Sequence, residues 1–577
     1  GNTYLEFNIL PNLEFRTQFG IDNVDREQRE FSGRNLRSFG GFPDGQANLF
    51  NEETTFWQVE NYATYDNDIG NHSINVVGGA SWQQNDFNNF GLNVEGFTSD
   101  FSGFNNVDAA SIVNAPSSSE GKWTINSYWL RNNYTFDRRY NVTFTARVDG
   151  SSRFGENQQY GFFPSVGAGW TITNEPYMDN KLDFIDNLRL RGSWGRTGNT
   201  EIGLFNSLAT VGGSTSLLSG ERVNTAFATR LPNPDLKWEV TRQWDIGIEF
   251  EAFDQFLQVE ADYYNKRTND LIIDRPIPAS TGFGFVTDNV GSVLNQGADV
   301  KITTNNIRTD RFRWTSTLNF NYNFNKIKDL GPVDQIFPGP FFVSGSQTVL
   351  QVGQAVNSFF AFERLGTWNI DEAEEAAQVG AVPGEAKRSD TRSIQGRGLP
   401  DWQGSFIHTF GYKNWEFTAD FEFAANADIA QQFIHTTEDR TGLANSLSTV
   451  LTESFTPENQ DTQIQRIRNF PLSGQNSQFD TGWIVDGTYL RGNQFALSYT
   501  FDQGFLSNYG LQSVRLTASV DNAFVVTTSD FKGFDPVGTS SLGPGDAANT
   551  GGNFGQNIFF HQFPKPRTVT FKANIRF

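Results

Sequence analysis

The chain has 577 residues, no Cys, and 65 Asp and Glu against 44 Lys and Arg, which gives a formal net charge of −21 at pH 7. The absence of Cys excludes a disulfide framework, a thiolate nucleophile and a Cys-ligated zinc or iron–sulfur site, and the acidic balance argues against a nucleic-acid-binding protein. No run of about 18 apolar residues occurs, so a transmembrane helix is excluded, whereas membrane strands, which show lipid only at every second residue, are not.

Alternating apolar and polar residues predict strands along the whole chain. The clearest case is 312–324, where one parity is apolar (Phe312, Trp314, Leu318, Phe320, Tyr322, Phe324) and the other polar (Arg313, Thr315, Thr317, Asn319, Asn321, Asn323). In chain order, the same rhythm predicts strands at 140–148, 187–194, 244–250, 257–263, 312–324, 415–423, 514–520 and 569–577. In the last of these, Val569, Phe571, Ala573, Ile575 and Phe577 are expected to share the apolar face.

The lengths of the connections distinguish two all-β architectures. Strands are joined by short links such as 137–139, 253–254 and 413–414, and long polar segments separate the pairs, at 23–50, 88–121, 197–236, 331–403, 428–488 and 522–564. A stack of soluble β-sandwiches also has alternating strands, but it has no reason to alternate short and long links. Tight turns on one side and long functional loops on the other are typical of an outer-membrane β-barrel.

The strand count predicts about 17 strands, with the first and the last running in the same direction. Because an intact bacterial barrel has an even number of strands, we expect an odd number of strands to precede this chain, and five would make a barrel of 22. A lumen of that size needs a plug, and no plug-like segment is recognisable. The sequence therefore predicts that residues 1–577 are the C-terminal part of a transmembrane antiparallel β-barrel.

Six motifs, in a fixed order, resemble the SusC/RagA-like family of TonB-dependent outer-membrane transporters of Bacteroidota. They are DGSSRFGENQQYGFFPSVGAGW at 149–170, LRLRGSWGRTGN at 188–199, NPDLKWEVTRQWDIGIEF at 233–250, YYNKRTNDLI at 263–272, YLRGNQFALSYTF at 489–501 and NAFVVTTSDFKGFDP at 522–536. Glycines of the first motif (Gly150, Gly155, Gly161, Gly167, Gly169) suit sharp turns and a closely packed barrel wall. The terminal Phe577 resembles the outer-membrane assembly signal.

The resemblance implies the function. The whole protein would import oligosaccharides through the outer membrane, driven by TonB, with a SusD-like surface lipoprotein as a lid; oligopeptides are the alternative ligand, and a passive porin-like channel is the alternative mechanism. In this family a small β-domain, a TonB box and a plug precede the barrel, and none of them matches this sequence. The segment 383–404 lacks the Asp-x-Asn-x-Asp-Gly pattern of the loop that many members carry there, so the resemblance does not imply bound calcium.

Enzymatic chemistry is not indicated. The four His (His72, His408, His435, His561) show no metal-binding spacing. Carboxylate pairs such as Glu249 and Glu251 recur with period 2, which places them on a hydrated polar face rather than in a general acid/base site. The sequence thus predicts no catalytic residue, no metal and no cofactor.

Aromatic residues in the expected loops are the candidate contacts with a ligand or a lid. A Phe in a loop that faces water must be covered by neighbouring loops, by a partner protein or by the substrate. The candidates are Trp82, Phe87, Phe90, Phe97, Phe101 and Phe104, together with Phe337, Phe341 and Phe342. The acidic segment 371–377 is expected to form a short surface helix.

Overall fold

The computed structural model describes residues 1–34, 45–178, 183–218, 220–338, 347–439, 445–467, 478–507, 510–537, 556–559 and 565–576. The chain forms two compact units. Unit 1 comprises Gly1–Trp170, Ser193–Arg242 and Thr268–Val290, and unit 2 comprises Thr171–Gly192, Gln243–Arg267 and Gly291–Phe577.

Unit 1 contains a ladder of antiparallel strands in which each strand pairs with the next long strand in the chain. A short strand, β5 (Ala110–Val113), pairs with the far end of β4. The ladder consists of β1 (Asn2–Leu10), β2 (Leu13–Ser32), β3 (Gln46–Ile69), β4 (His72–Phe97), β6 (Ser117–Phe136), β7 (Tyr140–Ser151) and β8 (Tyr160–Thr171).

Unit 2 contains a second antiparallel ladder, built in the same way. Its strands are β16 (Ser292–Arg308), β17 (Phe312–Asp329), β24 (Trp402–Tyr412), β25 (Trp415–Ala425), β28 (Tyr489–Thr500), β29 (Ser513–Thr527) and β31 (Thr568–Arg576). Three more strands contribute residues to both units, namely β9 (Ile185–Asn199), β12 (Glu239–Ala252) and β13 (Leu257–Asn269).

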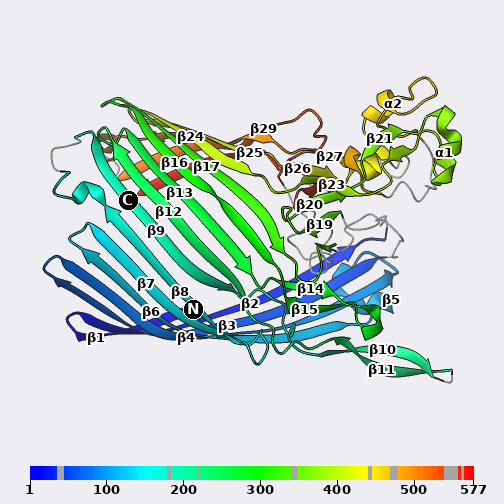
Figure 1. Ribbon diagram of the computed structural model, residues 1–577, viewed down its shortest axis with the longest axis horizontal. Coiled ribbons are helices and arrows are strands. Elements are labelled where there is room, and N and C mark those ends of the chain that lie inside the picture. Colours follow the sequence, from blue (N-terminus) through cyan, green and yellow to red (C-terminus); the bar gives the residue numbers. More distant parts are fainter. Residues whose placement is uncertain are drawn as a thin grey trace. The chain divides into compact units, whose positions relative to one another are not determined.

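The predicted all-β fold and strand count are confirmed. In the part of the chain that the structure describes, the main sheet has eighteen strands, and seventeen remain once the four-residue β5 is set aside. Among the described residues, no helix is long and apolar enough to cross a membrane. Figure 1 shows the long strands of both ladders and the few short helices.

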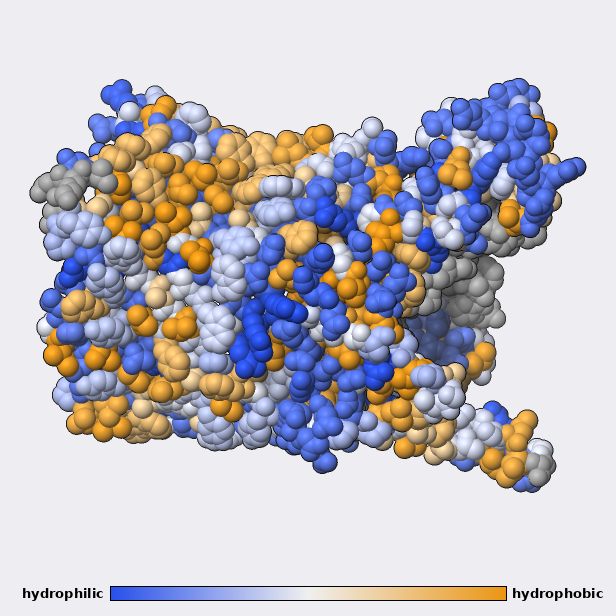
Figure 2. All heavy atoms as spheres, viewed as in Figure 1, coloured by the Kyte–Doolittle hydropathy of each residue, from blue (hydrophilic) through white to orange (hydrophobic). Residues whose placement is uncertain are grey.

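The registers confirm the predicted faces. In unit 2, one rung across successive strands joins apolar residues only, in the order Phe571, Ala518, Leu497, Phe417, Phe410 and Trp314. The next residues along each strand point to the other face and are mostly polar, such as Lys572, Thr517 and Thr315. We call these the apolar and the polar face. Large apolar side chains stay exposed on the apolar face, and orange patches cover part of the strands in Figure 2.

The connections alternate in length within each unit, as predicted. Residues 70–71 join β3 to β4, and residues 413–414 join β24 to β25, whereas 330–401 separate β17 from β24. The short links use the left-handed conformation that tight hairpins require: Asp137 and Arg138, between β6 and β7, both have φ of 52°.

Two predicted loops of unit 1 are much shorter than expected. The sequence predicts loops at 23–50 and 88–121, but β2 continues to Ser32, β3 begins at Gln46, β4 continues to Phe97 and β6 begins at Ser117. A tilted strand needs about 9–11 residues to cross a bilayer, so most of the 26 residues of β4 lie beyond the hydrocarbon layer. Because both faces of such an extension meet water, polar residues can occupy successive positions, and the alternation that identifies a strand is lost.

The long connections of unit 2 form what we call the loop region, the described parts of 330–401, 426–488 and 556–559. Its small sheets contain β18 (Gln335–Ile336), β19 (Thr348–Gln351), β20 (Ser358–Ala361), β21 (Arg364–Thr367), β22 (Ala386–Arg388), β23 (Ser393–Arg397), β26 (Asp428–Gln431), β27 (Ile484–Asp486) and β30 (Ile558–Phe559). Its helices include α1 (Ala373–Gln378), which confirms the expected acidic surface helix, and α2 (Thr449–Glu453). Both helices lie near β21 in Figure 1. A third short helix, α3 (Gln503–Leu506), lies between β28 and β29.

Two of the sequence motifs pack against each other in unit 1. The Trp238 ring lies 4.7 Å from Phe154 and 5.2 Å from Phe163, and Gly155 donates a backbone hydrogen bond to Leu236. A Cβ at Gly155 would come within 2.0 Å of a carbonyl oxygen, so only glycine fits there. The motifs therefore build the wall, as expected.

Two hairpins complete unit 1. The first pairs β10 (Thr210–Leu218) with β11 (Glu221–Arg230), and the second pairs β14 (Ile272–Pro276) with β15 (Phe285–Asn289).

Candidate binding site

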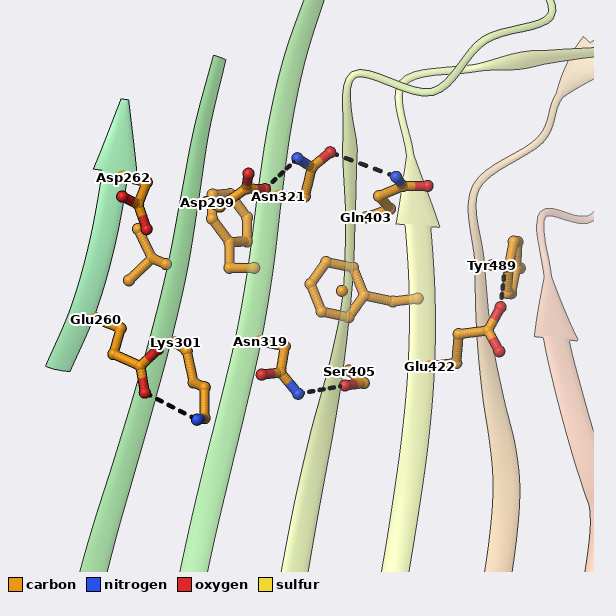
Figure 3. Close-up of a pocket in the computed structure, with 14 residues that line it drawn as sticks. Glu260, Asp262, Asp299, Lys301, Asn319, Asn321, Gln403, Ser405, Glu422 and Tyr489 are labelled. Carbon is orange, nitrogen blue, oxygen red and sulfur yellow. Dashed lines mark hydrogen bonds and ion pairs between the residues drawn. The ribbon is translucent and has the colours of Figure 1, made fainter. Parts of the chain in front are cut away.

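A pocket of about 450 Å³ lies on the polar face of unit 2. Its polar side chains come from neighbouring strands of the ladder, at positions where alternation directs them to the same face. They are Glu260 and Asp262 of β13, Asp299 and Lys301 of β16, Asn319 and Asn321 of β17, Gln403 and Ser405 of β24, Glu422 of β25 and Tyr489 of β28. Figure 3 shows these side chains side by side across the strands.

Hydrogen bonds across the strands fix these side chains in rows. Asn321 Nδ2 donates to Asp299 Oδ1 at 2.5 Å, and Asn321 Oδ1 accepts from Gln403 Nε2 at 3.3 Å. Asn319 Nδ2 donates to Ser405 Oγ at 2.9 Å. The three strands thus present an ordered surface of amide and hydroxyl groups (Figure 3).

Charged groups border this surface. The Lys301 ammonium lies 2.9 Å from Glu260 Oε1, and Arg191 Nη2 lies 2.6 Å from Asp262 Oδ2. At the other border, the Tyr489 hydroxyl donates to Glu422 at 2.6 Å. The border therefore carries carboxylates, and its Lys301 is already held by a carboxylate.

This arrangement is suited to binding rather than to catalysis. Amides both donate and accept hydrogen bonds, and carboxylates accept them, so the surface can hold several hydroxyl or amide groups of a ligand at once. Within the described ranges, no three His, Asp or Glu side chains come together in a way that could hold a metal ion. The pocket offers a polar, water-accessible wall along which a hydrophilic molecule can bind.

A buried ion-pair network holds the loop region together. Arg364 donates to Asp439 at 3.1 and 2.6 Å and to Asp480 at 2.9 Å, and Arg388 Nε donates to Asp480 at 2.5 Å. These side chains are at most 6% exposed. Burial alone would raise the pKa of Asp439, but the charge and hydrogen bonds of Arg364 and the Trp483 indole lower it below its usual value. Asp439 therefore stays ionised at neutral pH, and its bonds to Arg364 join two distant parts of the loop region.

The larger part of the chain matches a known family model. The model, described as TonB dependent receptor-like, beta-barrel, matches residues 2–370, which is more than half of the chain. The chain belongs to this family. It is therefore a β-barrel protein of the outer membrane, as predicted, and in such barrels the apolar face meets lipid while the polar face lines the lumen.

Curated relatives belong to the same class. The chain is 29% identical to TonB-dependent receptor P3 and 31% identical to TonB-dependent receptor P26, both of Formosa agariphila; all of this chain aligns, against 58% and 59% of those proteins. It is 28% identical to TonB-dependent receptor SusC of Bacteroides thetaiotaomicron, over 73% of this chain and 42% of SusC. The chain thus spans less than two thirds of the length of these relatives.

Solved structures show the same fold. The RagAB peptide transporter matches the whole chain with a TM-score of 0.80 at 23% identity, and 61% of the matched chain is covered. The RagAB peptide importer in its open-open state matches with a TM-score of 0.81 at 24% identity, and 60% of that chain is covered. The predicted resemblance to the SusC/RagA-like class of TonB-dependent receptors is confirmed.

The structure corrects the interpretation of several aromatic candidates of unit 1. Trp82, Phe87, Phe90 and Phe97 are not in a loop but on β4. Trp82 points to the same face of the unit 1 ladder as Tyr128, and both rings are partly exposed there, which suits lipid rather than a ligand. Phe97 is 1% exposed and packs edge-on against Phe31, so this side chain supports a small core and cannot contact a partner directly.

The remaining candidates differ in how accessible they are. Phe104 packs partly buried against the core of Phe97, and Phe87 lines a second pocket, of about 380 Å³, with Asp86 and Lys122. Phe90 is 49% exposed and Phe101 is 99% exposed. Phe90 and Phe101 therefore remain the accessible candidates of this segment.

The candidates of the loop region are only partly described. Phe337 is 48% exposed, and its ring lies 5.3 Å from that of Phe360. Phe341, Phe342 and Phe577 lie outside the described residues. For all three, the roles expected from the sequence stay predictions.

The sequence does not predict the polar residues of the pocket as a site. The alternation at positions such as Asn319 and Asn321 predicts a polar wall and no more. Asp299 lies 22 residues before Asn321 in the chain, and Gln403 lies 82 residues after it. The three side chains meet only because the strand register places them next to one another. A run of amides at every second position of one strand was the signal that could have pointed to this surface.

Proposed function

We propose that the chain is the larger part of the barrel wall of a SusC/RagA-type importer, and that the complete protein carries oligosaccharides into the periplasm. TonB would drive import through an N-terminal plug, and a SusD-like lipoprotein would cover the loops. Membership of the TonB-dependent receptor family supports this proposal, and the names of two relatives, SusC and RagAB, indicate the class.

The barrel would be completed by strands outside this chain. β1 pairs with β2, and β31 pairs with β29, while all nine residues of each of these two strands are exposed. Unpaired backbone groups cost several kcal/mol each in lipid, so both strands need partners in the membrane. We propose that upstream residues of the same polypeptide supply them and that five further strands make a barrel of 22.

The proposal about the ligand rests on the pocket on the polar face of unit 2. Asn319, Asn321, Gln403 and Ser405 can donate to and accept from sugar hydroxyl groups. The carboxylates Asp299 and Glu422 would repel anionic ligands and accept hydrogen bonds from neutral ones. We therefore favour neutral oligosaccharides as the ligand, and no covalent chemistry is needed.

Oligopeptides are the second candidate. Peptide groups use the same donors and acceptors, and basic side chains would be attracted by the carboxylates of the pocket. The structural match to the RagAB peptide transporter is consistent with this alternative but, at 23% identity, concerns the fold alone.

An uptake experiment in the natural host tests the proposal. The gene of the full-length protein is deleted and restored, and cells receive neutral oligosaccharides or peptides with and without a protonophore. We expect the restored gene to confer saturable oligosaccharide uptake that the protonophore abolishes. Uptake that persists without the protonmotive force would indicate a passive channel, and energised uptake of peptides alone would replace the oligosaccharide proposal by the peptide one.

A further inference from the structure

Two of the six sequence motifs, 489–501 and 522–536, are joined by a buried ion pair in unit 2. The Arg491 guanidinium of β28 donates to Asp535 twice, from Nη1 to Oδ2 at 3.0 Å and from Nη2 to Oδ1 at 2.7 Å. The side chains of Arg491 and Asp535 are only 3% and 6% exposed. Because a two-fold bond of this kind fixes the plane of the guanidinium, Asp535 determines where the charge of Arg491 lies.

A register shift in β28 directs Arg491 to the polar face. The pairing of β28 with both β25 and β29 shifts between Gly492 and Gln494. Since an extra residue reverses the alternation of a strand, Tyr489 and Arg491 lie on the same face as Gln494. That face is the polar one, and Arg491 stands directly opposite Glu422 of β25.

Glu422 and Arg491 face each other but bind different partners. Directly opposite residues of antiparallel strands are close enough for opposite charges to pair. Glu422 instead accepts a hydrogen bond from the Tyr489 hydroxyl at 2.6 Å, and both side chains border the pocket of unit 2 (Figure 3). The Arg491 guanidinium carbon lies 5.6 Å from the centre of the Tyr489 ring. Arg491 is thus held beside the pocket, within reach of Glu422, by its bonds to Asp535.

Asp535 is itself fixed by the segment 528–537. Its Oδ1 also accepts from the Val537 amide at 2.8 Å. Lys532 of the same segment donates its backbone N–H to Gln431 at 2.6 Å and its ammonium to Glu438 at 2.7 Å. Because Gln431 and Glu438 are buried in the loop region, the Asp535 carboxylate is anchored independently of the guanidinium that it binds.

We propose that Asp535 is a positioning residue of the candidate binding site. It keeps the Arg491 guanidinium away from Glu422, so the Glu422 carboxylate stays available to Tyr489 and to a hydroxyl or amide N–H of the ligand. Without the Asp535 charge, Arg491 pairs with Glu422, displaces the Tyr489 hydroxyl and neutralises this border of the pocket. The inference rests on the proposed function for the effect on the ligand, whereas the positions of the three side chains can be tested without a ligand.

Nitration of Tyr489 tests these positions in the purified full-length protein. Tetranitromethane attacks ionised phenols, and a hydroxyl that donates to a carboxylate ionises reluctantly. The variants are Asp535→Asn, Arg491→Gln and the double variant with both changes, and peptide mass spectrometry follows Tyr489. Asp521→Asn is the matched control, because Asp521 of β29 accepts from the uncharged Gln494 at 2.7 Å. Heat-modifiable migration on gels confirms barrel assembly of each variant.

The double variant distinguishes positioning from a general loss of structure. We expect Asp535→Asn to accelerate nitration of Tyr489 about tenfold, because Arg491 then favours the ionised phenol and occupies Glu422. Arg491→Gln, the double variant and Asp521→Asn should keep the slow rate of the natural protein, because Tyr489 still donates to Glu422. Fast nitration in Arg491→Gln or in the double variant, or the natural rate in assembled Asp535→Asn, would overturn the proposal.

Uptake by cells that carry each variant measures the effect on the ligand. The probes are fluorescently labelled malto-, xylo- and cello-oligosaccharides and, in a parallel arm, a labelled casein digest. For the probe that the natural protein imports, Asp535→Asn should raise the half-saturation concentration about tenfold at an unchanged maximal rate per assembled protein, and the double variant should restore it. An unchanged half-saturation concentration in Asp535→Asn would refute the role in binding. If the natural protein imports none of these probes, the proposed function is contradicted, and nitration still decides the positions.

Discussion

Replacing Asp480 by alanine should open the loop region of unit 2 while the barrel wall stays intact. The Asp480 carboxylate is fully buried and accepts from Arg364, Arg388 and the Gly482 amide at 2.9, 2.5 and 2.9 Å. Its removal takes one carboxylate away from two buried guanidinium groups, those of Arg364 and Arg388. Breaking a buried ion pair on one side costs about 3–5 kcal/mol, which raises the population of the open loop region by roughly two to three and a half orders of magnitude.

Hydrogen exchange of the full-length protein in detergent or nanodiscs measures this opening. Amides of 347–401, 426–439 and 478–487 should exchange faster in Asp480→Ala, while those of β24 and β25 should keep the rates of the natural protein. The matched control is Glu374→Ala, because Glu374 is an exposed acidic residue on α1 of the same loop region. Exchange of the loop region at the rate of the Glu374→Ala control would refute the role assigned to the network.

Three further predictions follow from the same structure. The lowered pKa of Asp439 means that its contribution to the stability of the loop region is complete above its unfolded pKa of about 3.9 and is lost as the pH falls through its lower folded pKa. The protection of the loop-region amides, which is their exchange rate relative to that of an unfolded chain at the same pH, should therefore stay constant from pH 7 to about pH 4 and fall only below it. Phe571→Arg places a charge on the apolar face, at a cost of about 2–4 kcal/mol near the bilayer midplane, so it should lower the yield of assembled barrel far more than Lys572→Ala; equal yields would contradict the assigned faces. Cysteines at Phe7 and Phe571 should not form a disulfide in the assembled full-length protein if, as we propose, strands from upstream residues separate β1 from β31; an efficient cross-link would rule out the 22-stranded barrel.

The strands could be predicted from the sequence wherever one face meets lipid and the other meets water. Between Phe312 and Phe324 this contrast makes every second residue except Ser316 apolar, and the structure pairs residues 312–322 with β24 in the expected register. The strand ends could not be predicted in the same way. Residues 83–86 of β4 are Gln, Gln, Asn and Asp, polar on both faces, because this part of the strand extends beyond the lipid.

The site could be predicted less well than the fold because it depends on contacts between distant segments. Arg364 binds Asp439 and Asp480, which follow 75 and 116 residues later in the chain, and no local pattern marks these three residues as partners. The sequence predicts the aromatic residues of β4 as contacts with a ligand or a lid only because they lie in a segment that is expected to be a loop. Burial, as for Phe97, and register, as for Trp82, decided what each of them contacts.

Cysteine labelling most directly tests the central claim, that the polar face of unit 2 is the wall along which an oligosaccharide is imported. The chain contains no Cys, so single cysteines at Asn321 and at the adjacent Phe320 report on the two faces without background from this chain. In outer membranes containing the full-length protein, a charged maleimide should label Asn321→Cys and not Phe320→Cys, and the oligosaccharide identified in the uptake experiment should slow the labelling of Asn321→Cys. Labelling of Phe320→Cys instead, or labelling of Asn321→Cys at a rate that this oligosaccharide leaves unchanged, would contradict the account.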